Sequence, residues 1–177
     1  MQSDFGLGRL WGLQFSATPL APLGTLLIWL AAGLAAYWML DLSILAAAAV
    51  GLAGALLWWL ADIVHHFGHA YAARTAGYPM VGIELGQFAI FCRSVYPADE
   101  PELPAAVHIR RALGGPILSF AVGIGAGLLA LLLAEGSVGW WLAAYTAVVS
   151  FVVFGLGAFL PLGFTDGSTI LTWWGKR

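Results

Sequence analysis

Four side chains that could bind a metal ion or move protons lie within eight residues of one apolar stretch: Asp62, His65, His66 and His69. His65 and His69 are four residues apart, so on an α-helix they lie about 40° apart and can reach one ion together. His66 points about 60° away from His69, so we expect it to flank such an ion without ligating it. Asp62 comes one turn earlier and could accept the second ring hydrogen of a ligating histidine. Alternatively, the same four groups hydrogen-bond to one another inside a helix bundle that holds no metal.

A fifth candidate is Asp166, which follows the last long apolar stretch, in the segment FLPLGFTDGSTIL. We expect it at the same end of the protein as the histidines. Its carboxylate could then complete a set of two nitrogens and one oxygen, with an open fourth position for water. Taken alone, Asp166 would more simply cap the short helix that follows it.

The elements that must position these groups are membrane-spanning helices. Hydrophobic residues make up 61% of the 177 residues and charged residues only 9%, whereas about 25% is typical of a soluble domain. Four gaps of at least 20 residues contain no charge, and about 20 helical residues cross the hydrocarbon core of a bilayer. The sequence predicts an all-α membrane protein, a single domain over residues 1–177, with transmembrane helices near 20–40, 43–75, 108–134 and 138–160. Series of small residues such as AAGLAA and AAAAVGLAGA predict close contacts between these helices.

The basic residues indicate how the chain is oriented. Four spans place all seven on one side: Arg9, Arg74, Arg93, Arg110, Arg111, Lys176 and Arg177. By the positive-inside rule, both termini and the long segment 77–107 are expected to face the cytoplasm. The membrane itself is expected to be a bacterial inner membrane. The net charge of −2 and the lack of a basic run argue against a nucleic-acid partner.

Residues 77–107 form the long break between spans. The first part, VGIELGQFAIFCRSVY, mixes β-branched and aromatic residues with glycine and predicts a short cytoplasmic-side β-hairpin. The second part, PADEPELP, predicts an exposed linker. We expect Glu84, within the hairpin, to be a solvated surface residue, although it is also a conceivable proton acceptor.

Three separated motifs together resemble the site-2 protease family of intramembrane zinc metallopeptidases. HHFGHAYAARTAG (65–77) is similar to the family's H-E-F-G-H-A-x-A-A-R segment, with His66 in place of the glutamate. RALGGPILSF (111–120) is similar to the A-L-A-G-P segment that opens the family's next core helix, and AFLPLGFTDGS (158–168) resembles N-x-x-P-x-P-x-L-D-G-G. The resemblance implies that His65, His69 and Asp166 are zinc ligands.

The same resemblance implies that the catalytic groups are damaged. His66 stands at the catalytic glutamate position, and Ala158 stands where the family has an asparagine near the substrate carbonyl. The glutamate takes a proton from the attacking water and passes it to the leaving amine. A protonated histidine would put a positive charge beside the cation where glutamate becomes neutral. Loss of an oxyanion donor typically costs about 10²–10³ in rate.

Three functions are therefore compatible with the sequence. The leading hypothesis is a pseudoprotease that keeps the fold, with or without a bound zinc ion, and serves as a binding or structural subunit of a larger membrane complex, in contact with other transmembrane proteins or helices. The second is an active intramembrane zinc protease that uses His66 in place of glutamate. The third is a subunit whose histidines are axial ligands of a haem or chlorophyll-type pigment.

Overall fold

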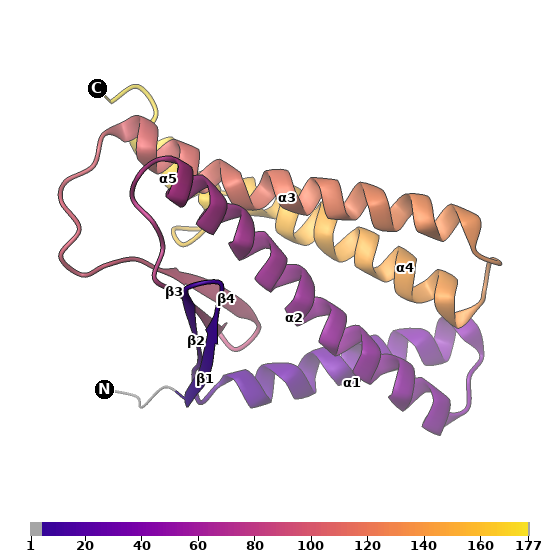
Figure 1. The fold of residues 1–177 in the computed structure, drawn as a ribbon. Coiled ribbons are helices and arrows are strands. Elements are labelled where there is room, and N and C mark those ends of the chain that lie inside the picture. The colour runs from indigo at the N-terminus through magenta and orange to yellow at the C-terminus, as the bar shows by residue number, and fades with distance from the viewer. Residues whose placement is uncertain (1–4, 177) are drawn as a thin grey trace.

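The computed structural model describes residues 5–176, which form helices and a small sheet (Figure 1). Arg177, counted among the basic residues above, lies outside the described residues. The strands are β1 (Phe5–Leu10), β2 (Leu13–Ala17), β3 (Gly82–Gln87) and β4 (Phe91–Val95). The helices are α1 (Ala21–Leu40), α2 (Ile44–Thr75), α3 (Ala105–Leu132), α4 (Val138–Val148), the π-helix η1 (Val149–Leu156), the 3₁₀-helix η2 (Gly157–Phe159) and α5 (Asp166–Trp173).

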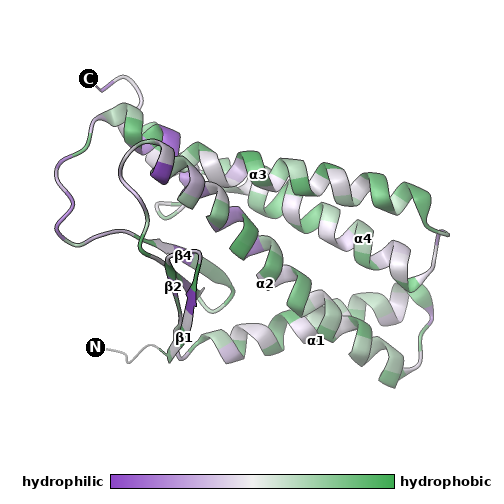
Figure 2. Ribbon diagram, viewed as in Figure 1, coloured by the Kyte–Doolittle hydropathy of each residue, from purple (hydrophilic) through white to green (hydrophobic). Residues whose placement is uncertain are grey.

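Four helical segments are long and apolar enough to cross a membrane: α1, α2, α3, and α4 together with η1 and η2. They are green over most of their length in Figure 2, which marks hydrophobic residues. Many large apolar side chains point outward from them; Leu131 and Leu132, for example, are 80% and 83% exposed. Such a surface suits lipid, where helices satisfy their own backbone groups. The four predicted long apolar helices are confirmed, although α3 begins three residues earlier than expected.

Small residues set the spacing between the helices. A side chain on Gly51 of α2 would come within 2.6 Å of the Gly33 backbone in α1. Gly68 of α2 and Gly114 of α3 face each other so closely that a Cβ on either would collide with the other's carbonyl. These contacts confirm the prediction that small residues mark close helix packing. The contact between Gly68 and Gly114 brings α3 against the face of α2 that carries the histidines.

The last span departs from a regular helix near the end that leads into α5. At Val149 the α-helix widens into η1, and Phe154 in this segment places its ring 5.9 Å from that of His65, measured between centroids. π-Helical turns are uncommon and often occur at functional sites. The irregular segment therefore lies beside the residues that the sequence singles out.

The sheet is larger than expected. Its order is β1-β2-β3-β4, with β2 and β3 parallel and the outer pairs antiparallel. The predicted hairpin is β3–β4, but the N-terminal hairpin β1–β2 was not predicted. Its signal is the two-residue connection Trp11-Gly12, in which both residues have positive φ (50° and 84°), as type I′ turns require. The sheet lies at the end of the bundle where α2 ends and α3 begins, together with α5 (Figure 1).

Candidate metal centre

Three predicted ligands meet between α2 and α5. His65 Nε2 and His69 Nε2 are 2.9 Å apart. Asp166 Oδ2 is 3.3 Å from His65 Nε2, and Asp166 Oδ1 is 3.4 Å from His69 Nε2. Both histidines are buried and the aspartate is largely buried. The structure thus brings together two residues separated by one helical turn and a third almost a hundred residues later in the chain.

The opposite nitrogen of each histidine is held by α3. His65 Nδ1 lies 2.9 Å from Ser119 Oγ, and His69 Nδ1 lies 2.8 Å from the carbonyl oxygen of Arg111. A carbonyl only accepts, so His69 carries its proton on Nδ1 and its Nε2 is bare. The Gly115 amide is also 3.3 Å from this Nδ1, but the shorter carbonyl contact decides the tautomer. Outer partners of this kind fix the rings of metal-ligating histidines.

Gly115 is the position in α3 that lets the two rings lie against the helix. A Cβ there would come within 2.5 Å of His65 Nε2 and would also collide with His69 Nε2. Glycine is therefore required where α3 passes the two nitrogens. Gly115 belongs to RALGGPILSF (111–120), the second of the three segments that carry the resemblance in the sequence.

The geometry of the three donors fits a divalent cation such as zinc. Tetrahedral zinc with ligands at about 2.0–2.1 Å has ligand atoms about 3.3 Å apart, close to the observed separations of 2.9 Å, 3.3 Å and 3.4 Å. Burial raises the pKa of the Asp166 carboxyl, and a cation beside it would favour the ionised form. Two imidazoles and one carboxylate leave a fourth position open, as in catalytic zinc sites.

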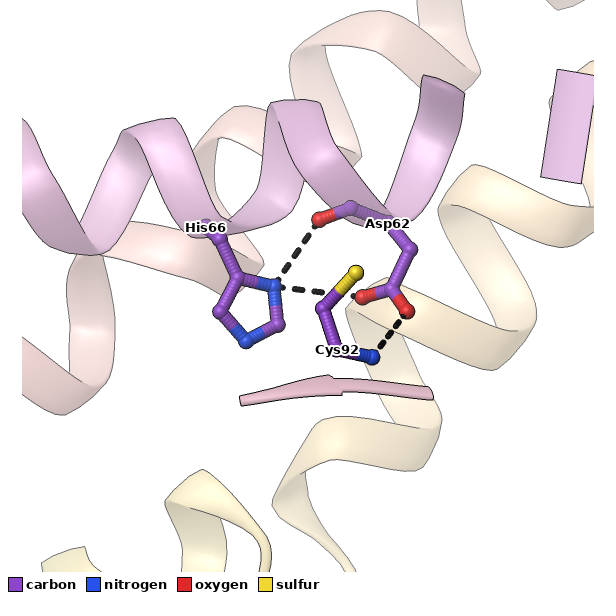
Figure 3. Close-up of side chains that lie close together, drawn as sticks. All are labelled: Asp62, His66 and Cys92. Atoms are coloured by element: carbon purple, nitrogen blue, oxygen red, sulfur yellow. Dashed lines mark hydrogen bonds and ion pairs between the residues drawn. The ribbon is translucent and has the colours of Figure 1, made fainter. Parts of the chain in front are cut away.

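His66 is buried beside this group but is not one of its three donors. Its ring centroid is 5.3 Å from that of His65 and 5.4 Å from that of His69. His66 Nδ1 lies 3.2 Å from Asp62 Oδ1 and 2.9 Å from the Asp62 carbonyl oxygen. The other Asp62 oxygen, Oδ2, accepts a 2.6 Å hydrogen bond from the Cys92 amide of β4 (Figure 3). Asp62 thus orients His66, and not a ligating histidine as the sequence had suggested.

Asp62, His66 and Cys92 also have the residue types of a second metal site, since one ligand atom from each lies within 4.8 Å of the others. However, burial raises the pKa of the Cys92 thiol well above its ordinary value, and the charge of Asp62 adds to the effect. A protonated thiol is a poor ligand and a poor nucleophile. The Asp62 oxygens are already used by the His66 ring and the Cys92 amide, so hydrogen bonding accounts for this group.

A cavity of about 640 Å³ opens beside the candidate metal centre. Its walls come from α2, β4, the start of α3, the η1–η2 segment and α5, and they include all three candidate ligands. His66 and Ala158 both line it, so the positions at which the resembled family has its glutamate and its asparagine face the cavity. This volume is in the range of small-molecule and peptide side-chain sites.

Two other charged residues differ from their predicted settings. Glu84 is only 8% exposed, and its Oε2 lies 2.9 Å from Arg93 Nη2. It is therefore not the solvated surface residue that we expected. Arg111 is also buried, where it donates to both oxygens of Glu100 and to the Tyr78 carbonyl. Its guanidinium lies 4.2 Å from the centroid of the Tyr96 ring. Arg111 therefore ties the acidic linker to α3, and this pairing had no signal in the sequence.

No protein-family model matches the chain, and no curated protein matches it either. Among solved structures, the chain is similar to "Site-2 Protease from Methanocaldococcus jannaschii", with a TM-score of 0.63. The match covers 96% of this chain and 70% of that one, at 17% sequence identity. This chain has the fold of that membrane protease. Such low identity establishes the fold and leaves the chemistry to be argued from the site.

Proposed function

We propose that the protein is a degenerate member of the site-2 protease family that binds zinc through His65, His69 and Asp166. Three observations support the proposal. The three donor atoms lie 2.9–3.4 Å apart, and hydrogen-bond partners on the Nδ1 atoms leave both histidine Nε2 atoms directed at the same point. The third observation is the fold. Zinc would supply a Lewis acid at this position. The chain's own residues hold the ligands and shape the cavity beside them.

The role that fits the cavity best is binding without routine cleavage. The observation that carries this proposal is Ala158, which lines the cavity at the position of the family's asparagine and offers only a methyl group. The glutamate position is occupied by His66, whose Nδ1 is used by Asp62. A transmembrane segment of another protein would occupy the cavity and rest against β4, and the protein would act as a subunit of a membrane complex.

The active-protease hypothesis is the second candidate, and one observation favours it. Asp62 places a carboxylate 3.2 Å from His66. A neutral histidine beside a carboxylate carries the same net charge as an ionised glutamate. After each gains one proton, the histidine–aspartate pair and the glutamate are both neutral overall. This removes the electrostatic objection to His66, whereas the missing donor at Ala158 still implies about 10²–10³ in lost rate.

For His65 and His69, the pigment hypothesis has no comparable support. His65 and His69 turn their Nε2 atoms toward each other at 2.9 Å, which leaves no space between them for the plane of a macrocycle. An axial ligand instead needs its nitrogen to face an open, flat cavity. Absence of visible absorption in the purified protein would exclude this function.

The orientation and location proposed from the sequence also fit the fold. Arg74, Arg93, Arg110 and Lys176 belong to the end of the bundle that carries the sheet and α5 (Figure 1). We place this end, with both termini, in the cytoplasm of a bacterial cell, by the positive-inside rule. Reaction of single introduced cysteines with an impermeant reagent would test the orientation.

Two measurements test the function. The first is quantitative mass spectrometry of the particle extracted gently from native membranes; stoichiometric partner chains are expected, and a chain that emerges alone counts against the subunit role. The second is cleavage of a transmembrane peptide by the zinc-loaded protein. No cleavage is expected, while His66→Glu combined with Ala158→Asn is expected to produce it. Cleavage by the natural protein that Asp166→Ala abolishes would overturn the pseudoprotease and favour the second candidate.

A further inference from the structure

Asp62 is a buried acidic residue in a membrane-spanning helix that is not one of the proposed metal ligands. It is 1% exposed, and an ionised group in such a place is costly unless it has partners. It has two. His66 Nδ1 lies 3.2 Å from Oδ1, and the Cys92 amide donates to Oδ2 at 2.6 Å (Figure 3). A residue so fully bonded has a defined effect on each partner.

Its effect on His66 is to fix the position of the ring proton. His66 Nδ1 faces two oxygens that can only accept, namely Asp62 Oδ1 and the Asp62 carbonyl oxygen at 2.9 Å. Nδ1 must therefore carry the proton, and in the neutral ring Nε2 is bare. Within residues 5–176, Nε2 has no hydrogen-bond partner and is not among the fully enclosed polar atoms, and His66 lines the cavity.

We propose that Asp62 is a positioning residue that holds His66 as the Nδ1–H tautomer, so that Nε2 accepts a hydrogen bond from a donor bound in the cavity. The neutral His66 ring then offers a hydrogen-bond acceptor at the place where a carboxylate would offer one. The role assigned to the cavity rests on the proposed metal-binding function, but the tautomer does not. A histidine oriented by aspartate is a familiar arrangement in hydrolases, where loss of the aspartate leaves the wrong tautomer.

The amide contact of Asp62 makes the proposal testable with one substitution. In Asp62→Asn the side chain has one acceptor and one donor end. The Cys92 amide can only donate, so the amide oxygen must turn toward it, which leaves the NH₂ group facing His66 Nδ1. That arrangement opposes a proton on Nδ1. We expect the His66 ring to shift toward the Nε2–H tautomer.

The experiment is ¹⁵N NMR of metal-free protein in detergent, labelled at its four histidines. The signals of His66 are assigned by their loss in His66→Gln. The unaltered protein is expected to show a protonated Nδ1 and a bare Nε2 for His66, and Asp62→Asn is expected to reverse the two. Cys92→Ala is the matched control, because it removes the thiol, keeps the backbone amide, and should leave the tautomer unchanged.

A neutral His66 ring with its proton on Nε2 and a bare Nδ1 in the unaltered protein would overturn the proposal directly, even if no variant folds. An unchanged Nδ1–H tautomer in Asp62→Asn would overturn it too, since the helix carbonyl would then orient the ring by itself. Both measurements are made without metal. A protein that never binds zinc would thus refute the proposed function while the assignment to Asp62 could still hold.

Discussion

Ser119 offers the sharpest test of the proposed zinc site, because it touches a ligand without being one. Its hydroxyl is 2.9 Å from His65 Nδ1, and the residue is 1% exposed. The corresponding partner of His69 is a backbone carbonyl, which no substitution removes. Ser119→Ala frees the His65 ring to rotate. We expect zinc affinity to fall about 10–100-fold, as for other partners that orient metal ligands, which is about 1.4–2.8 kcal/mol.

Ser150 provides the matched control. It is a second buried serine, also 1% exposed, but its hydroxyl has no hydrogen-bond partner within the described part of the chain. Ser150→Ala removes the same oxygen from a similar depth and should leave zinc affinity unchanged. It should also be neutral or slightly stabilising, because an unsatisfied buried hydroxyl is lost.

Affinity is measured by competition with a zinc-binding dye in detergent, on both variants and the unaltered protein. Equal affinity in all three would mean that the Ser119 hydroxyl does not orient a zinc ligand, and the reasoning from the His65 orientation would be wrong. An equal loss in both serine variants would instead indicate a general loosening of helix packing. Only a loss confined to Ser119→Ala fits the proposed geometry.

Two further predictions concern α3 and the linker. Gly115→Ala puts a methyl group within 2.5 Å of His65 Nε2, so it should abolish tight zinc binding and lower the free energy of unfolding by about 1–3 kcal/mol through overpacking. Gly125→Ala is the control, because a methyl group there meets nothing within 4 Å and should have neither effect. Dye competition and thermal melting measure the two effects. The hydrogen bonds from Arg111 lower the pKa of Glu100 below 4.5, so this pair should stabilise the fold fully above pH 4.5 and lose that contribution as the pH falls toward the lowered pKa. Glu100→Gln should flatten this part of the pH–melting curve, and an unchanged curve would contradict the assignment.

The sequence predicted much of the fold because the bilayer leaves few alternatives. Charge-free gaps of 20 residues specify helices regardless of packing, and the glycine-mixed segment after α2 predicted β3–β4. The N-terminal hairpin was missed because only the Trp11-Gly12 turn indicated it. The widening of the last helix at Val149 depends on tertiary packing and has no local signal.

The candidate site divides in the same way. The spacing of His65 and His69 follows from helical periodicity, so their approach to each other could be predicted. Their partners could not, because Ser119 and the Arg111 carbonyl reach them only through the close contact of α2 with α3 at Gly68. Asp62 was assigned to the wrong histidine because its direction depends on the Cys92 amide of β4, which periodicity does not locate.

The proposed ion has a consequence for the fold itself, whether or not the site is catalytic. Helix α5 packs against α3 and η2, and it reaches α2 through the contacts of Asp166 with His65 and His69. Zinc would therefore join the end of the chain to the central helix. Because the ion would bind the folded state, it should stabilise that state by about 4 kcal/mol at 1,000 times its Kd.

Removing the metal should consequently loosen α5 before the rest of the bundle. We expect a chelator to increase hydrogen exchange at the α5 amides, with little change in α1 or in the first half of α2, which carry none of the proposed ligands. In the Asp166→Asn variant, the α5 amides should exchange as fast as in the chelator-treated unaltered protein, with or without zinc. Uniform protection of α5 in all three states would show that α3 and η2 are sufficient to hold it, and a structural role for the ion would then have no basis.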